Sequence, residues 1–159
     1  MAFTLAQLQL IKAEIVVDPA LNGQPNTADG AFEIAQMLNT IAVPDFTVWR
    51  TNVPTADCKK AMSWTEFIGR SAGERDAWQF MIANGTLNAG DTNVRQGVQD
   101  IFSGPQGLVS RTNLLNIAKR LARRIERVLA TGVGSSASPA TMGFEGTISF
   151  GDVLAARAL

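Results

Sequence analysis

The chain has 159 residues, with 14 basic and 14 acidic side chains, no His and one Cys. This length suits one domain, and a hydrophobic fraction of 46% with a charged fraction of 18% predicts a packed core. The lack of His excludes catalytic triads and metal sites that depend on His, and one Cys permits neither an internal disulfide nor a cysteine-rich zinc site.

The N-terminal stretch predicts neither a signal peptide nor a membrane span. It has no basic segment at its start, and Lys12 and Glu14 interrupt its apolar residues. We therefore expect synthesis in the cytoplasm, where the polar surroundings of Cys58 fit an ordinary thiol of a reducing compartment.

Helical signals dominate the rest of the chain, and several helix starts carry capping residues. The predicted starts are Thr4 with Gln7, Thr27 or Asp29, Thr55, Ser63 with Glu66, Ser71 with Glu74, and Asp91. The predicted ends are Asp18-Pro19, Asn39, Met62, Asn84-Gly85 and Gly104-Pro105. Residues 18–26 predict a loop, and the alternation within 43–53 predicts a short extended segment.

The longest predicted helix runs from about Ser110 to Ala130 and carries a continuous apolar stripe. Residues 132–143 form a Gly/Ser-rich linker, 144–150 predict a strand, and a helical turn capped by Asp152 ends the chain. The expected fold is mainly α: a compact helical bundle over residues 1–131 with a long basic amphipathic helix, followed by the linker and an extended C-terminal arm, 144–159, that contains a short β-strand.

Basic residues concentrate in the predicted long helix, where six of them accompany one acid, Glu126, between positions 107 and 131. Arg120, Arg123, Arg124 and Arg127 have the spacing of one helix face. Three interpretations are open: a solvated face paired with acids of neighbouring elements or subunits, a surface facing DNA phosphates, or a membrane-surface helix.

The predicted strand of the arm has no nearby partner in the sequence, and its backbone needs hydrogen bonds. It can pair with the 43–53 segment of its own chain or add to a neighbouring subunit. Phe144, Ile148 and Phe150 are its candidate docking residues.

No pattern predicts catalysis, so no catalytic, cofactor-binding or metal-binding residue is assigned and we expect a protein that is not an enzyme. Gly132–Ser135 follows a helix and lacks a Gly-Lys-Ser/Thr sequence, which argues against a phosphate loop. The acids lie mostly at predicted helix starts, where they stabilise the helix dipole. Trp49, Trp64 and Trp78 are expected to fill core or interface positions rather than to form a ligand cage.

Four stretches resemble proteins of tailed bacteriophages: TADGAFEIAQMLN, VPDFTVWRTNV, DTNVRQGVQDIFSG and, most specifically, the stretch from Ala130 to Ser149. The resemblance is to the head-tail connector family, that is, the adaptor or head completion proteins. It implies a structural virion protein of the neck region, made in the bacterial host cytoplasm, that forms a homo-oligomeric ring of about twelve copies beneath the portal.

The partners implied by this resemblance are the portal protein, neighbouring copies of the chain, and a downstream head-tail stopper or tail protein. DNA would pass through the channel without sequence specificity, and no membrane or cofactor is expected. On this hypothesis the four arginines face DNA or a neighbouring subunit, and the arm docks on the portal or a neighbour. Deletion of 140–159 is then expected to leave a folded protein that cannot assemble.

Two alternatives remain open at this stage. The chain could be another neck or tail protein, such as a stopper or a tail terminator. It could also be a small DNA-binding module that uses the 110–130 helix, with Arg111, Thr112 and Asn113 available for base contacts. Overall neutrality, with a sequence pI near 6.2, argues against a dedicated DNA binder.

Overall fold

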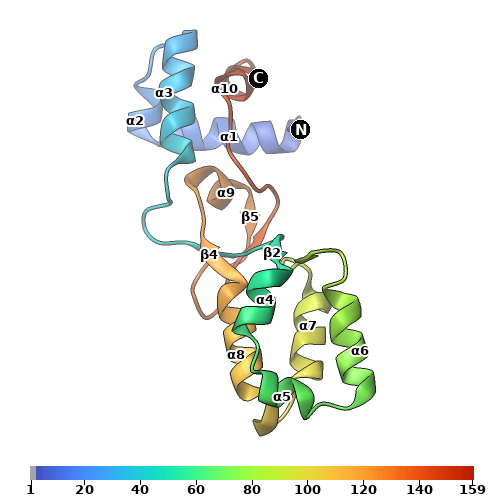
Figure 1. Cartoon of the computed structure of the whole chain (residues 1–159). Helices are drawn as coiled ribbons and strands as arrows, with labels where there is room; N and C mark the ends of the chain where they lie inside the picture. Colours follow the sequence, from blue (N-terminus) through green and yellow to red (C-terminus); the bar gives the residue numbers. More distant parts are fainter. Residues whose placement is uncertain (1–2) are drawn as a thin grey trace. The chain divides into compact units, whose positions relative to one another are not determined.

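The computed structural model describes residues 3–159 and divides into two compact units, each of which is described by itself (Figure 1). The described residues of unit 1 are 3–48 and 121–159, and those of unit 2 are 49–120. The described residues contain ten α-helices and a few short strands, which confirms the mainly helical class. The chain passes from one unit to the other at β1 (Thr47–Trp49) and β4 (Lys119–Leu121), so the boundaries predicted after residues 131 and 143 do not coincide with these units.

Unit 1 is built from both ends of the chain. Its elements are α1 (Leu5–Val17), α2 (Pro19–Asn22), α3 (Ala28–Asn39), α9 (Arg124–Leu129), β5 (Ala130–Thr131), β6 (Thr141–Met142) and α10 (Phe150–Arg157). Helix α10 packs against α3 and α1, and α9 packs against the same two helices. The buried side chains include Ile11, Ile34, Leu38, Ile125 and Val153, so both chain ends share one core.

The first two predicted helix starts are confirmed in unit 1. Thr4 and Gln7 form the expected capping box, and the Thr27 hydroxyl, rather than Asp29, accepts the first cap bond of α3 from Gly30 N at 3.2 Å. The segment predicted as a loop, 18–26, contains the short helix α2, because the Asp18 carboxylate accepts a 2.7 Å bond from Ala20 N.

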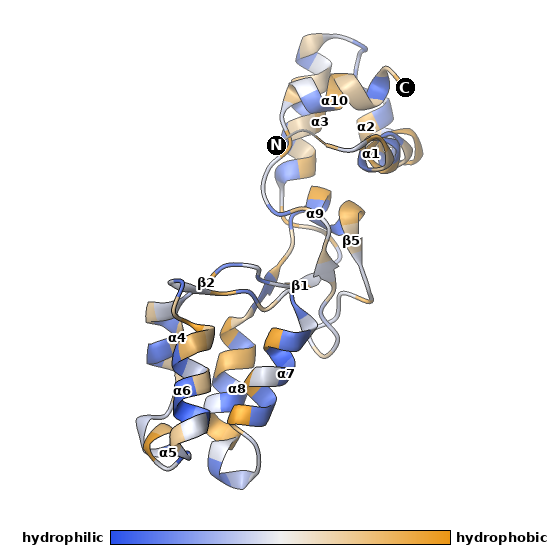
Figure 2. Ribbon diagram, turned by 90° about the vertical axis from the view of Figure 1, so that its right-hand side faces the viewer, coloured by the Kyte–Doolittle hydropathy of each residue, from blue (hydrophilic) through white to orange (hydrophobic). Residues whose placement is uncertain are grey.

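Unit 2 is a small helical bundle, in which α4, α6, α7 and α8 surround an apolar core (Figures 1 and 2). Its elements are β2 (Val53–Pro54), α4 (Thr55–Ala61), α5 (Trp64–Ile68), α6 (Ala72–Met81), β3 (Thr86–Leu87), α7 (Thr92–Ile101), the 3₁₀ turn η1 (Pro105–Gly107) and α8 (Leu108–Ile117). Strands β2 and β3 pair antiparallel with Val53 opposite Leu87, which joins the start of α4 to the segment after α6.

The caps predicted at Ser63, Ser71 and Asp91 are confirmed in α5, α6 and α7. Thr55 is not a cap: it is the first residue of α4, and its hydroxyl donates to the Ile82 carbonyl oxygen at 2.9 Å. A capping residue lies just outside the helix, whereas Thr55 is the first residue inside α4. Its side chain therefore does not cap α4 and links it to the end of α6 instead.

The prediction of one continuous helix over 110–130 is wrong. Helix α8 ends at Ile117, β4 follows, and α9 begins at Arg124. The Ala118 carbonyl oxygen accepts from Arg50 N at 2.8 Å, and Ala122 N donates to the Phe46 carbonyl oxygen at 2.8 Å. Because these backbone groups pair with the 41–50 segment, they are not available for helix hydrogen bonds.

The predicted strand over 144–150 is also wrong. The described strand in this part of the chain is β6, which pairs antiparallel with β5 and places Ala130 opposite Met142. Just before it, Ala140 bridges to Val48 and donates to the Thr47 carbonyl oxygen at 2.9 Å. The terminal helix has about the predicted length of two turns, but its cap is Ser149, and Asp152 completes the capping box instead of serving as the cap.

Candidate functional site

The four arginines predicted to share one helix face do not share one. Arg120 belongs to β4 in unit 2, whereas Arg123 precedes α9 and Arg124 and Arg127 lie within α9 in unit 1. The interruption at residues 118–123 removes the regular spacing on which the prediction depended.

Arg124 is the centre of an ion-pair cluster inside unit 1. Its guanidinium bonds the Glu14 carboxylate at 2.8 and 2.9 Å and also contacts the Asp18 carboxylate, while Arg127 reaches Glu14 at 3.4 Å. The hydrogen bond from Arg124 holds the pKa of Asp18 below its ordinary value. For Arg124 and Arg127, the interpretation as cations paired with acids of a neighbouring element is therefore confirmed.

Other arginines also bind their own chain. The arginine side chains that donate hydrogen bonds to backbone carbonyl oxygens or to side-chain oxygens of this chain include Arg50, Arg70, Arg75, Arg95, Arg111, Arg123, Arg124, Arg127 and Arg157. Several of these carbonyls lie at helix C-termini, where cations are stabilised by the helix dipole. The guanidinium groups are thus directed largely at structural partners.

An open hollow of about 390 Å³ lies over the ion-pair cluster of unit 1. Val17, which is 79% exposed, Val43, which is 84% exposed, and Ile41 line it together with Glu14 and Arg124. Exposed apolar side chains grouped around charged groups are typical of a surface that binds another protein. We call this surface the α1–α9 hollow.

The C-terminal segment lies on unit 1. The Asn39 side chain makes two hydrogen bonds of 2.9 Å with the backbone of Ile148. Its amide nitrogen donates to the Ile148 carbonyl oxygen, and its amide oxygen accepts from Ile148 N. Of the predicted docking residues, Ile148 is buried in the core, Phe144 is partly buried against Phe3 with ring centroids 4.7 Å apart, and Phe150 is half exposed. In the single chain, the arm is therefore part of unit 1.

Glu126 also anchors this segment, although its side chain is fully buried. Its carboxylate accepts from Gly146 N at 3.0 Å and from Arg123 N at 2.7 Å. Sequence reasoning missed this residue and Asn39. The one signal for Glu126 was its position as a lone acid among basic residues.

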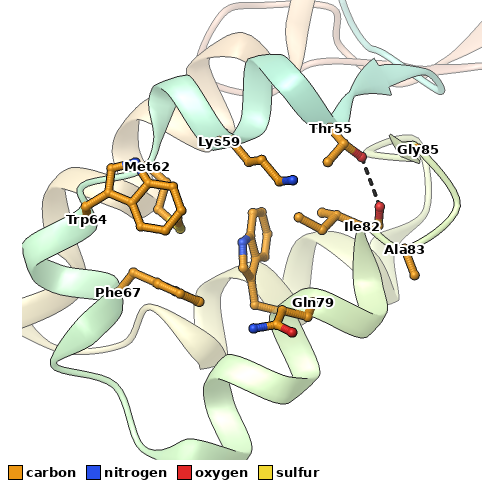
Figure 3. Close-up of a pocket in the computed structure, with 10 residues that line it drawn as sticks. Thr55, Lys59, Met62, Trp64, Phe67, Gln79, Ile82, Ala83 and Gly85 are labelled. Atoms are coloured by element: carbon orange, nitrogen blue, oxygen red, sulfur yellow. Dashed lines mark hydrogen bonds between the residues drawn. The ribbon is translucent and has the colours of Figure 1, made fainter.

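In unit 2, a groove of about 470 Å³ runs between α4 and α6 (Figure 3). Its buried residues are Met62, Phe67, Trp78 and Ile82, and Trp64 forms a partly exposed wall. Figure 3 shows the amino group of Lys59 pointing across the groove from α4 towards α6. No sequence pattern pointed to this groove, because its residues come from three helices.

The three tryptophans have different surroundings. Trp78 is buried and packs edge-on against Phe102, as expected for a core position, while Trp64 lines the α4–α6 groove. Trp49 contacts two cations, with Arg95 at 4.8 Å and Lys119 at 5.6 Å from its ring centroid.

Reactive groups are few in the described part of the chain. Cys58 is buried, and burial raises the pKa of its thiol to about 11. Among residues 3–159, no three acidic or Cys side chains gather as a metal site would require. Over the same residues, no helix combines the length and apolar character needed to cross a membrane.

Comparison with known proteins yields no relative: the chain matches no family model, no curated protein and no solved structure.

Proposed function

We propose that this chain is a structural virion protein of a tailed bacteriophage: an adaptor that forms a ring beneath the portal and links the capsid to the tail. The proposal takes its phage assignment from the resemblance of residues 27–39, 43–53, 91–104 and 130–149 to head-tail connector proteins. The mainly helical fold agrees with that assignment.

The observation that carries the structural role is the α1–α9 hollow. Val17 and Val43 expose most of their apolar surface beside a cluster of paired charges. Exposed apolar side chains that gather at one place, rather than singly, are typical of an interaction surface, and a charged floor adds specificity to such a contact. The hollow suits a protein partner, for which the portal is our candidate.

DNA contact, in this proposal, is sequence-independent and weak. Arg124 and Arg127 donate to Glu14 and to the Val43 carbonyl oxygen, which leaves them poorly placed for phosphates. The alternative of a DNA-binding module relied on an unbroken helix over 110–130, and the interruption at β4 weakens it. A head-tail stopper or a tail terminator remains the second candidate.

The test is to mix the full chain with the portal protein encoded in the same genome and to determine the mass of the complex by native mass spectrometry. An adaptor should bind in copies that match the portal symmetry. The substitution Val43→Asp should abolish the complex, whereas Val133→Asp, at a similarly exposed valine outside the hollow, should leave it intact.

Three results would contradict the proposal. Binding to tail proteins without binding to the portal would favour the stopper or the tail terminator. Duplex DNA binding with a steep salt dependence would favour the DNA-binding module. Equal portal binding by both Asp variants would exclude the hollow as the docking surface.

The deletion test suggested by the sequence needs replacement. Removal of 140–159 would take Ile148, Val153 and Ala156 out of the core of unit 1. Their loss exposes the apolar faces of α1 and α3, so we no longer expect the truncated chain to fold. Point substitutions on the surface keep the core intact and separate folding from assembly.

A further inference from the structure

The α4–α6 groove has the features of a receptor for an aromatic side chain. Its floor is apolar, with Trp78 and Phe67 buried, and Trp64 stands beside Phe67 in an edge-to-face contact with ring centroids 5.6 Å apart. An aromatic ring inserted there would lie against the rings of Trp64 and Phe67, and such aromatic contacts are favourable. In the single chain the exposed apolar surface of the groove is its wall, Trp64, which is 55% exposed.

One charged group stands at this groove without a counterion. Lys59 projects from α4 across the groove (Figure 3), and its ammonium group makes no ion pair or hydrogen bond among residues 3–159. A ligand that fits the groove should therefore carry an acidic group beside its apolar part.

The outer surface of α6 carries such a combination. Phe80 is 85% exposed, the most exposed large apolar side chain described in the chain. Asp76 precedes it by four residues and so lies on the same face of the helix. Within the described residues, Asp76 has no ion-pair or hydrogen-bond partner. We call Phe80 and Asp76 the α6 knob.

We propose that the α6 knob of one copy of this chain inserts into the α4–α6 groove of a second copy. Phe80 of the first copy fills the space lined by Trp64 and Phe67 of the second, and Asp76 of the first copy pairs with Lys59 of the second. Both exposed apolar surfaces are covered by one contact, and both uncompensated charges find a partner.

The knob and the groove are different surfaces of unit 2. Phe80 follows Trp78 of the groove floor by two residues, which places these side chains about 160° apart around α6, whereas Gln79, which also lines the groove, lies between them. In the proposed ring each copy inserts its knob into one neighbour and receives the knob of another, so the contact is heterologous. Repeated heterologous contacts form a closed ring or an open filament. The inference deepens the proposed function and rests on it, because it supplies the contact between ring subunits.

The experiment is to measure the mass of the full chain by light scattering and sedimentation from micromolar to millimolar concentration. Wild type should associate beyond the dimer. Phe80→Ser should weaken the association by about 30-fold or more, as expected for a central aromatic anchor. Ile68→Ser is the matched control: this exposed side chain on α5 lies outside both the groove and the knob.

A charge exchange tests the polar half of the contact. Lys59→Glu and Asp76→Lys should each weaken association by about fivefold, because each places like charges together. The double variant should recover most of the loss, which a purely structural role of either residue would not produce. Circular dichroism of each variant verifies that unit 2 remains folded.

The outcomes separate this contact from the proposed function. An oligomer that persists unchanged in Phe80→Ser overturns the contact and leaves the ring proposal standing. A wild type that stays monomeric throughout the concentration range overturns the contact as well, while the portal-binding test still decides the function. A two-fold dimer as the largest species contradicts the heterologous geometry.

Discussion

Glu126 should be one of the most sensitive positions for the stability of unit 1. Its carboxylate is fully buried and accepts hydrogen bonds from Gly146 N and Arg123 N, with the Arg123 guanidinium 4.0 Å away. The substitution Glu126→Ala removes both acceptors and leaves the two N–H groups without these partners. It also leaves a cavity where the buried side chain of α9 packs in unit 1.

The expected loss follows from the number and type of these bonds. A hydrogen bond to a charged group contributes about 1.5–3 kcal/mol net, so the bonds from Arg123 N and Gly146 N together amount to about 3–6 kcal/mol. That is a large share of the roughly 5–15 kcal/mol that holds a typical domain together. Glu126→Gln should lose about half as much, because its amide keeps one acceptor oxygen and turns a donor towards the other N–H group.

The assay is amide hydrogen exchange at Gly146 and Ile148, since exchange there reports the local opening of the C-terminal segment. A loss of about 3 kcal/mol corresponds to exchange that is faster by about 100-fold or more. Glu33→Ala, at an exposed acid of α3, is the control and should leave these rates nearly unchanged. Unaltered exchange at Gly146 in Glu126→Ala would refute the anchoring role of the buried carboxylate.

Three further predictions concern other positions. Gly134→Ala should destabilise unit 1 by about 1–3 kcal/mol, because Gly134 has a φ of +74° and a Cβ there would lie 2.1 Å from the Phe46 ring. Urea unfolding measures this loss, and an unchanged midpoint would contradict the prediction. Native Cys58 should react with iodoacetamide at least about a hundredfold more slowly than in denaturant, given its burial and raised pKa, and equal rates would contradict this. The bond from Arg124 lowers the pKa of Asp18, so the ionised carboxylate should stabilise unit 1 at neutral pH. This stabilisation should be lost as the pH falls below about 4. In unfolding measured from pH 7 to pH 2, Asp18→Asn should remove this part of the acid sensitivity.

Local signals in the sequence determined where most helices begin. The capping boxes at Thr4 and Ser71 and the cap at Asp91 occur in the structure as predicted. Each cap bond joins groups two or three residues apart, so it depends on little beyond the local sequence. The same locality explains why the mainly helical class could be predicted from these signals and the apolar spacing.

The interruption between α8 and α9 depended on contacts that a local pattern does not contain. No Gly or Pro separates Ile117 from Arg124, and the residues there have the composition of a helix. Their backbone instead pairs with Phe46 and Arg50, about 70 residues earlier in the chain. Tertiary pairing thus overrode a helical pattern whose propensity advantage amounts to only tenths of a kcal/mol per residue.

The same contrast applies to the candidate interaction surfaces. The sequence by itself identified a basic concentration and a distinct C-terminal segment, and it predicted neither the partners of Arg124 nor the burial of Ile148. Glu14 lies 110 residues from Arg124, and Asn39 lies 109 residues from Ile148. The α1–α9 hollow and the α4–α6 groove likewise exist only once distant helices meet. Composition and local spacing determine which residues can form caps, cores and ion pairs, but the packing of distant segments decides which side chains meet and which remain exposed, because those contacts are made through space rather than along the chain.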